Sequence, residues 1–294
     1  MPQRTGTIGA GSTGAGTSGA GASGAGASGA GASDVTPDAA RQAATSLEGA
    51  LRNRAALAAL PPGCAPTDHD EAYLVQDAWA ALGERPVAGW KVGATSAAAL
   101  AMLSTDRPFA GRILGPSVLD SPARFAAATG SGISVEGELA FVLGRDLAPR
   151  GRPYDRDEVA AAVATLRPAI EIVGSRFADW PSAGLYSLIA DNGGNAGLVL
   201  GPAVAGWEEH DLSSAPVTMT IDGETAGSGS SGDAMGHPLQ SLAWLANHLA
   251  DRGQGLVAGQ VVTTGSCTGI APLAEGATAV ADFGQLGRVE LRHG

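Results

Sequence analysis

Two carboxylates stand inside an apolar segment of this chain, residues 135–144 (VEGELAFVLG), where few arrangements of a charged group are stable. Successive side chains of an extended strand point to opposite faces, so Glu136 and Glu138 share one face of an otherwise apolar strand. A second apolar run, residues 169–173 (AIEIV), carries Glu171 between two isoleucines. Runs of this kind are typical of strands that are buried on both faces. The sequence therefore predicts three carboxylates within buried β-structure.

Buried carboxylates lose their hydration and repel one another, so they either take up protons or surround a cation. Three oxygen donors suit a hard divalent ion such as Mg²⁺ or Mn²⁺. The alternative is that Glu136 and Glu138 mark the solvent face of a one-sided antiparallel strand. The metal site is favoured because Ala140 and Val142 continue that face without polar groups, and because Glu171 repeats the anomaly.

The first 33 residues have a different composition from the rest of the chain. They contain GAGAS three times in tandem, one charged residue (Arg4) and one large aliphatic residue (Ile8). Such a segment cannot bury enough apolar surface to order itself, which predicts a disordered tail. It lacks the apolar core of a secretory signal and the several arginines of an organelle-targeting peptide. A silk-like stacking role is an alternative, although three repeats are few.

Charge and cysteine content exclude several classes of protein. The formal net charge is −11, and such a surface repels phosphate backbones, so no nucleic-acid partner is expected. No apolar run reaches the length of a membrane span, so no membrane partner is expected. Cys64 and Cys267 are the only cysteines and have no CxxC spacing, which argues against a disulfide framework or a thiolate metal site. These features predict a cytoplasmic protein.

Lysine occurs once in the sequence, at Lys91, among eighteen basic residues. An ammonium group is a compact point charge whose pKa can shift, whereas a guanidinium is broad and permanently charged. A single retained lysine therefore favours a chemical role over a surface role. Chance is the alternative explanation.

The pattern of apolar residues predicts two N-terminal helices followed by a strand-rich body. Thr36 and Pro37 form a cap and first turn for a helix over residues 38–60, which Pro61 and Pro62 would end. A second helix is expected from about Thr67, with acids in its first turn, to Gly83. From residue 86, short apolar segments alternate with Gly and Pro. The expected organisation is a tail (1–33), a helical cap (34–85) and a metal-binding β-rich catalytic body (86–294).

Within the body, strands are expected over 87–94, 197–200 and 217–221, with a series of short strands after residue 255. Helices are expected over 155–166, leading through Pro168 into the strand with Glu171, and from Pro238 to Gly253. Residues 227–238 read as a Gly/Ser loop before that second helix. The loop lacks the lysine of a phosphate-binding loop, so a carboxylate contact or a plain connector is favoured over a nucleotide site.

Two loops carry further candidates for ligand contact. Asp106 lies in a loop expected beside Lys91. Asp191 and Asn192 precede a Gly-Gly pair, where backbone amides can approach a ligand, although either residue could equally belong to a plain turn. The histidines near the 238–253 helix have no Ser or Cys motif beside them and are interpreted as structural.

Six segments, in this order, resemble the 2-keto-4-pentenoate hydratases of the fumarylacetoacetate hydrolase superfamily: GWKVGATS, VEGELAFVLGRDL, PAIEIVGSR, ADNGGN, GHPLQSLAWLANHLADRG and AGQVVTTG. The resemblance covers roughly residues 40–292. It implies an α+β fold, a mixed β-sandwich roll of the fumarylacetoacetate hydrolase type with a small N-terminal helical cap. It also implies Mg²⁺ or Mn²⁺ as cofactor and a homo-oligomer.

The resemblance also assigns roles to residues of this chain. Glu136, Glu138 and Glu171 match metal-binding glutamates, Lys91 matches the active-site lysine, Asp106 matches an acid near the substrate, and Asp191, Asn192 and Thr264 lie in segments expected to bind substrate. The chain departs from the family pattern at Gln260, at residues 265–269 (GSCTG) and at Gly193-Gly194. These departures bear on the substrate rather than on the metal.

The implied reaction is the addition of water to a small 2-hydroxy-2,4-dienoic acid, such as 2-hydroxypenta-2,4-dienoate, through its 2-oxo form to give a 4-hydroxy-2-oxo acid, as in the catabolism of aromatic compounds. A metal that chelates the carboxylate and the adjacent oxygen would favour this chemistry. Lys91 would stabilise substrate charge or carry a proton. Asp106 would orient water or act as a base.

Three other functions are weighed against hydration. A 2-oxo-3-hexenedioate (4-oxalocrotonate) decarboxylase resembles the chain throughout, and release of carbon dioxide would distinguish it. A fumarylacetoacetate or acylpyruvate C–C hydrolase would need the His and Glu pair of that class, and residues 92–134 contain neither residue type. A non-catalytic metal-binding scaffold is disfavoured by the retention of Lys91 beside three acids.

Overall fold

The computed structural model describes residues 35–83, 85–126 and 131–294, and the predicted tail (1–33) lies outside them. The main α-helices are α1 (Pro37–Asn53), α2 (His69–Leu82), α3 (Ala97–Met102), α4 (Arg156–Ala160), α5 (Trp180–Ala183), α6 (Leu185–Ala190) and α7 (Pro238–Asp251). The strands are β1 (Val87–Gly93), β2 (Phe109–Leu114), β3 (Val118–Asp120), β4 (Ala123–Phe125), β5 (Ile133–Leu143), β6 (Val163–Val173), β7 (Asn195–Leu200), β8 (Pro216–Ile221), β9 (Glu224–Ser230), β10 (Val261–Thr263), β11 (Ala271–Leu273), β12 (Thr278–Asp282) and β13 (Arg288–His293).

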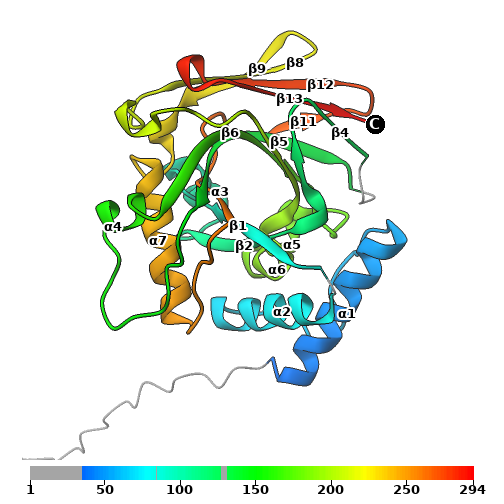
Figure 1. Ribbon diagram of the computed structural model, residues 1–294. Helices are drawn as coiled ribbons and strands as arrows, with labels where there is room; N and C mark the ends of the chain where they lie inside the picture. Colours follow the sequence, from blue (N-terminus) through cyan, green and yellow to red (C-terminus); the bar gives the residue numbers. More distant parts are fainter. Residues whose placement is uncertain (1–34, 84, 127–130) are drawn as a thin grey trace, which may run out of the picture. The chain divides into compact units, whose positions relative to one another are not determined.

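The strands form two sheets. The eight-stranded sheet has the order β2-β1-β10-β5-β6-β7-β3, with β11 paired to one end of β5. The five-stranded sheet has the order β4-β13-β12-β8-β9. In Figure 1 the five-stranded sheet crosses above the long, curved strands β5 and β6, while α7 flanks them. This mixed, open arrangement of two sheets with flanking helices is the α+β sandwich roll that the family resemblance implies.

Strands β5 and β6 are the longest strands and lie in the middle of the larger sheet. Their antiparallel ladder runs almost without interruption over both strands. One face of β5 buries Val135, Leu139 and Phe141 in the main hydrophobic core, together with Leu242 of α7. The opposite face carries the glutamates, so the core fixes the direction in which the acidic side chains point.

Helices α1 and α2 lie where two N-terminal helices are expected. Thr36 and Asp68 cap their first turns by accepting hydrogen bonds from backbone amides three residues along. The helices pack on each other through a small cluster that includes Leu47, Val75 and Trp79. Helix α1 is shorter than predicted and ends at Asn53, because Arg54 adopts a left-handed conformation that closes the helix well before the two prolines.

Two further expectations are wrong in detail. Of the helix expected over residues 155–166, only Arg156–Ala160 forms. Residues 163–166 belong to β6, because pairing with the far end of β5 outweighs the helical propensity of the alanines. Pro168 lies within this strand, where its carbonyl accepts a hydrogen bond from Gly201. Part of the Gly/Ser segment is strand β9, and its glycines allow the backbone of residues 267 and 268 to approach closely.

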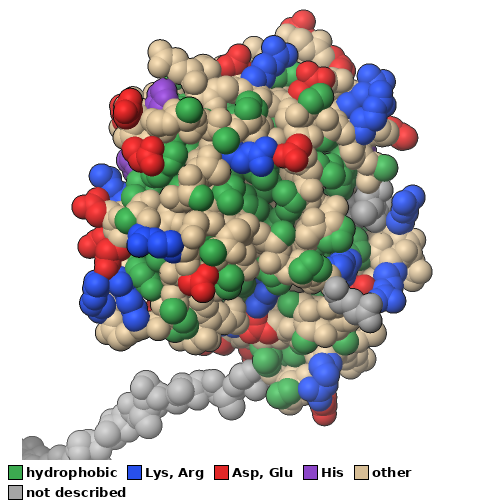
Figure 2. Space-filling view, viewed as in Figure 1, with side chains coloured by type: hydrophobic (Ala, Val, Ile, Leu, Met, Phe, Trp, Pro, Cys, Tyr) green, Lys and Arg blue, Asp and Glu red, His purple; other side chains and the backbone are tan. Residues whose placement is uncertain are grey.

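Charged groups of both signs are interspersed over the face of the molecule shown in Figure 2. Among the helices in the described ranges, none has the length and apolarity needed to cross a membrane.

Candidate metal and substrate site

The side chains of Glu136, Glu138 and Glu171 converge on one point. One carboxylate oxygen from each lies within 4.8 Å of the others. Strands β5 and β6 produce this arrangement, because Glu136 is directly opposite Glu171 in the antiparallel ladder and Glu138 is two residues farther along the same face. Glu138 and Glu171 are buried, and Glu136 is partly exposed. The structure therefore brings together the three carboxylates that alternation in the sequence singles out.

Lys91 is the cation beside this cluster. It lies on β1, and its Nζ is 3.3 Å from Oε1 of Glu171. The side chain is 5% exposed, so the ammonium and the glutamates interact in a region that is poor in water. Burial alone would lower the pKa of Lys91, but the charges of the three glutamates outweigh it and raise the pKa above its ordinary value. Lys91 is therefore a protonated, positively charged group.

One ammonium does not balance three carboxylates. Burial, and then the charge of Glu171, raises the pKa of Glu136 to about 7, although Lys91 and the hydroxyl of Ser266 oppose the shift. Burial and the two neighbouring glutamates raise the pKa of Glu138 well above its ordinary range. Such shifts are those expected of acids that lack sufficient positive charge nearby. The cluster has a stable charge balance only after it takes up a proton or a cation.

The hydrogen bonds around the cluster leave a fully buried oxygen for a ligand. Oε2 of Glu138 accepts a hydrogen bond of 2.8 Å from the backbone amide of Gly265. Oε1 of Glu171 accepts one of 2.9 Å from the side-chain amide of Asn195. Oε2 of Glu171 is buried and has no hydrogen-bond partner among the described residues. A buried, unpartnered carboxylate oxygen within an all-oxygen donor set fits a hard divalent cation.

A cavity opens beside the carboxylates. Its polar wall contains Lys91, Glu136 and Glu138, and its remaining wall is mostly apolar and includes Met102, Leu103, Phe109, Val173, Trp180, Leu188 and Ile270. The volume of this cavity is about 80 Å³. An adjoining cavity shares Met102, Glu136 and Ile270 with it and continues along residues 266–270.

Asp106 is not part of this cluster. It is exposed, in the loop between α3 and β2, and it does not line the cavity. The residues at the two ends of that loop, Leu103 and Phe109, do line the cavity. The neighbouring Arg107 contacts Nδ1 of His69 through Nη2 at 3.1 Å, which ties the loop to α2.

The residues expected to bind substrate lie around the cluster rather than in it. Both oxygens of the buried Asp191 are engaged, one by Ser175 at 2.7 Å and one by the guanidinium of Arg176. The hydroxyl of Thr264 donates to the carbonyl of Leu139 at 2.9 Å. Asp191 and Thr264 thus make structural hydrogen bonds here, and their contact with substrate stays a prediction.

The 192–194 turn separates the site from a second cavity. Asn192 faces that second cavity, whereas Gly193 lines the cavity with Lys91. Gly193 has φ +64°, and a Cβ placed there would lie 2.7 Å from Cε2 of Phe109. A side chain at this position would therefore collide with the wall of the site.

Sequence reasoning missed two groups that position the acids. Asn195 stands at the start of an apolar strand, and a lone amide in such a run is a signal that could have found it. The backbone amide of Gly265 carried no such signal, because it reaches Glu138 only through the pairing of distant strands.

Comparison with known proteins adds to this geometry. Residues 110–292 match the family described as fumarylacetoacetate (FAA) hydrolase C-terminal. The chain belongs to the fumarylacetoacetate hydrolase family. It is 34% identical over 239 residues to a 2-hydroxyhexa-2,4-dienoate hydratase of Comamonas testosteroni, covering 77% of this chain and 87% of that protein. It is 32% identical over 250 residues to a 2-keto-4-pentenoate hydratase of Paraburkholderia phymatum, covering 84% of this chain and 94% of that protein.

A solved structure of the same fold also carries information about ligands. The 4-oxalocrotonate decarboxylase of Pseudomonas putida G7, complexed with magnesium and adipate, superposes with a TM-score of 0.81 at 27% identity, over 88% of this chain and 98% of that chain. The fold class expected from the sequence is confirmed by this likeness and by the family match.

Proposed function

We propose that this protein is a divalent-metal-dependent hydratase that adds water to a small 2-hydroxy-2,4-dienoic acid and yields a 4-hydroxy-2-oxo acid. The convergence of Glu136, Glu138 and Glu171 beside a buried lysine carries this proposal. Hydratases of this kind are among the relatives that are at least 30% identical over most of the chain.

The three glutamates are the residues that would hold Mg²⁺ or Mn²⁺. The unpartnered Oε2 of Glu171 and the raised pKa values of Glu136 and Glu138 support this assignment. When bound, the cation supplies a Lewis acid that polarises the carboxylate and the neighbouring 2-oxygen of the substrate. The decarboxylase of P. putida G7 that shares the fold was solved with magnesium, which supports the choice of a hard ion.

Lys91 contributes a fixed positive charge on the substrate side of the glutamates. Its stem packs against Gly111 and Gly193, so the ammonium is held in place before substrate arrives. From there it donates a hydrogen bond to the 2-oxygen and neutralises the negative charge that develops there as the hydroxyl proton passes to water and a carbon of the diene takes up another proton from water. The apolar wall formed by Phe109, Leu188 and Trp180 excludes bulk water and strengthens this interaction.

Asp106 is proposed to orient the water that adds to the substrate. Because Leu103 and Phe109 border both the loop and the cavity, a movement of residues 104–108 would bring its carboxylate toward the substrate. Asp106→Asn tests this role, since it keeps the size of the side chain and removes the base.

Decarboxylation of a dicarboxylate is the second candidate, and the lining of the cavity disfavours it. The P. putida G7 decarboxylase was solved with adipate, a dicarboxylate. Among the described residues that line this cavity and its extension, Lys91 is the only cation. A second carboxylate would therefore lie against Met102 and Ile270 without a positive partner, which is unfavourable.

We further propose that the protein acts in the cytoplasm as a homo-oligomer. Both cysteines, Cys64 and Cys267, are free and buried, which suits a reducing compartment.

A substrate screen tests the proposed activity. Purified protein with Mg²⁺ or Mn²⁺ is incubated with 2-hydroxypenta-2,4-dienoate, 2-hydroxyhexa-2,4-dienoate, 2-oxo-3-hexenedioate and an acylpyruvate, while ultraviolet absorbance and carbon dioxide are followed. We expect the dienoates to be hydrated without release of carbon dioxide. Glu171→Gln should abolish turnover, whereas the exposed Glu224→Gln should not. Faster release of carbon dioxide from the hexenedioate, or cleavage of the acylpyruvate, would overturn the assignment.

A further inference from the structure

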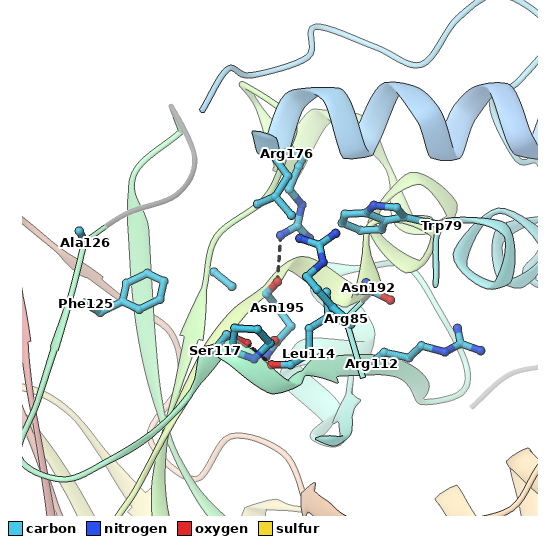
Figure 3. A pocket seen from close by; sticks show the side chains of 13 residues that line it. Trp79, Arg85, Arg112, Leu114, Ser117, Phe125, Ala126, Arg176, Asn192 and Asn195 are labelled. Atoms are coloured by element: carbon cyan, nitrogen blue, oxygen red, sulfur yellow. Dashed lines mark hydrogen bonds between the residues drawn. The ribbon is translucent and has the colours of Figure 1, made fainter. Parts of the chain in front are cut away.

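A second cavity lies on the other side of the 192–194 turn from the glutamates, between the N-terminal helices and strands β2 and β7 (Figure 3). Its volume is about 240 Å³, which is somewhat below the usual range for drug-sized ligands and suits a ring or a short chain. The proposed reaction does not use this cavity, because Glu136, Glu138 and Lys91 do not line it.

One end of the cavity holds two arginines, each of which pairs with an acid, Arg176 with Asp191 and Arg85 with Glu48. Arg176 and Arg85 gather near the indole of Trp79 (Figure 3). The guanidinium carbon of Arg176 is 5.0 Å from the centre of the indole, and Arg85 donates through Nη2 to Glu48, which also accepts from Nε1 of Trp79. Nε and Nη1 of Arg85 make no hydrogen bond with any residue that the structure describes. The Arg85 side chain is 28% exposed and lines the cavity.

Most of the remaining wall is apolar, although Arg112, Ser117, Asn192 and Asn195 also line the cavity. Leu51, Leu114, Pro116 and Phe125 contribute hydrocarbon and aromatic surface. A ligand that satisfies both ends carries one carboxylate for Arg85 and a hydrocarbon or aromatic body for this apolar part. A phosphate or a free inorganic anion would leave the apolar walls in contact with water and gain nothing from them.

The cavity is connected to the metal-binding acids by two hydrogen bonds. Nη1 of Arg176 donates to the backbone carbonyl of Asn195 at 2.9 Å. The side-chain amide of Asn195, which also lines the cavity, donates to Oε1 of Glu171 at 2.9 Å. A ligand that contacts Arg176 and Asn195 therefore acts on the position of a glutamate of the cluster.

We propose that this cavity is a regulatory site for a small monocarboxylate with an apolar body, and that its occupancy changes the affinity of the glutamate cluster for a divalent cation. Binding at the cavity is independent of the proposed hydration. The coupling rests on the proposed metal site, and thermodynamic linkage requires it to act in both directions.

The binding test uses 4-bromobenzoate as the probe and the full chain in EDTA. Crystals soaked with the probe locate bromine by its anomalous signal, and calorimetry gives the affinity. We expect bromine between Arg85 and Phe125 and weaker binding of the neutral analogue 4-bromobenzamide. Bromine only at the glutamates, or a cavity filled by a second copy of the chain, would overturn the proposal.

Two arginine variants provide a matched comparison, because both side chains pair with Glu48 but only one lines the cavity. Arg85→Gln should weaken probe binding about tenfold, the loss expected for one charge-assisted hydrogen bond, whereas Arg52→Gln should leave it unchanged. Circular dichroism verifies that both variants are folded. Equal losses in the two variants would mean that the charge of Glu48, and not the cavity, governs binding.

The coupling is measured by titrating Mn²⁺ into the protein with and without saturating probe. We expect the Mn²⁺ affinity to change about threefold or more, and the change to disappear in Asn195→Ala. An unchanged Mn²⁺ affinity with the probe bound would overturn the coupling. If the glutamates bind no metal at all, the proposed function fails while the bromine position and the Arg85→Gln result still stand, so the two failures are distinguishable.

Discussion

Glu136 stands directly opposite Glu171 across the β5–β6 ladder, so two carboxylates occupy one cross-strand pair in a buried sheet. Like charges that face each other in this way are destabilising unless another charge compensates for them. Lys91 compensates for part of this negative charge, since its Nζ lies 3.3 Å from Oε1 of Glu171. Glu138, however, adds a third carboxylate to the same face. The arrangement has a net negative charge that a divalent cation would balance.

Replacing any one of the three glutamates by Gln should lower metal affinity and turnover together. A ligand that binds only the folded state stabilises it by about 2.7 kcal/mol at a hundredfold excess over its Kd, so Mg²⁺ or Mn²⁺ should raise the Tm of the wild type. Each Gln variant should respond much less. Thermal melts with increasing metal, alongside turnover, measure both effects.

Without metal, the wild type should be less stable than the Glu136→Gln variant, the reverse of the order expected with metal bound. Because the pKa of Glu136 is raised to about 7, its ionisation opposes folding at higher pH, and Glu136→Gln should be more stable than wild type by ~1–2 kcal/mol at pH 8 in EDTA. The exposed Glu224→Gln is the control and should change neither measurement. A variant that loses stability in EDTA and keeps the full metal response would contradict the metal site.

Lys91→Arg should not behave as a conservative change. A Cβ on Gly111 or Gly193 would lie 3.1 Å or 3.2 Å from the lysine stem, so there is little room for a longer, planar group. We expect kcat/KM to fall about a hundredfold or more, the loss associated with misplacing a group that stabilises charge on the substrate.

The variant Lys91→Met distinguishes the effect of losing the positive charge from the effect of a side chain that is too large for the site. It removes the positive charge near the glutamates, so metal affinity should be retained or increased while activity is lost. Calorimetry with Mn²⁺ and a hydration assay provide the two readouts. Turnover at the wild-type rate in either variant would show that Lys91 takes no part in the reaction.

The glutamate cluster could be predicted from the sequence because strand alternation is local. Two acids at i and i+2 share a face whatever the strand pairs with, and Glu171 in an apolar run predicts a third buried acid. The pairing of β5 with β6 then brings the three glutamates together. The cluster could be suspected without knowledge of any contact between distant segments. Lys91 could be singled out because it is the only lysine.

The remaining features depend on contacts between segments far apart in the sequence. Residues 163–166 read as helix, and only the partner strand makes them extended. The amide of Gly265 reaches Glu138 across 127 positions, and the cavity near Arg85 is assembled from α1, α2, β2, β4 and β7. Patterns with a period of two or 3.6 residues contain no information about such assemblies.

Gly193→Ala should destabilise the protein more than a comparable change elsewhere. Gly193 has φ +64°, and a Cβ there would lie 2.7 Å from Phe109. Gly223, in the turn between β8 and β9, has φ +89°, but a Cβ there would have no atom within 4 Å. Gly223→Ala should therefore show only the conformational penalty, about 1–2 kcal/mol, whereas Gly193→Ala should add a steric penalty of about 1–3 kcal/mol.

Urea unfolding of both variants gives the comparison. Phe109→Leu in the Gly193→Ala background should recover part of the loss, because it removes the ring that the methyl group meets. Equal destabilisation by the two alanines would show that the 192–194 turn adjusts freely, and would weaken the view that Phe109 forms a rigid wall of the site.

His248 lies on α7 and packs between the rings of Trp244, also on α7, and Tyr73 of α2. A positive charge is poorly accommodated there. Its ring stacks on Trp244 with centroids 4.9 Å apart and planes at 6°, and it lies 4.9 Å from the ring of Tyr73. Nε2 is buried and has no hydrogen-bond partner among the described residues. Burial, and then the charge of Arg252, lowers the pKa of His248 to about 4, although Asp251 opposes the shift.

The sign of the pH effect follows from this shift. Between about pH 6.5 and pH 4 the unfolded chain binds a proton at His248 that the folded chain does not bind. Stability therefore falls as the pH is lowered through that window, and levels off only below the folded pKa. The contribution of His248 should be ~2 kcal/mol, reduced from the full shift because the ring is not fully buried.

His248→Phe keeps an aromatic ring between Trp244 and Tyr73 but cannot take up a proton. The variant should match the wild type in urea unfolding at pH 8, and it should lose less stability between pH 6.5 and pH 4. Subtracting the two stability curves removes the contribution of every group whose titration the substitution leaves unchanged, the glutamates of the metal site included. His237→Phe is not a suitable control, because His237 caps α7. If His248→Phe loses as much stability on acidification as the wild type does, the imidazole is protonated in the folded protein and the aromatic packing does not exclude its charge.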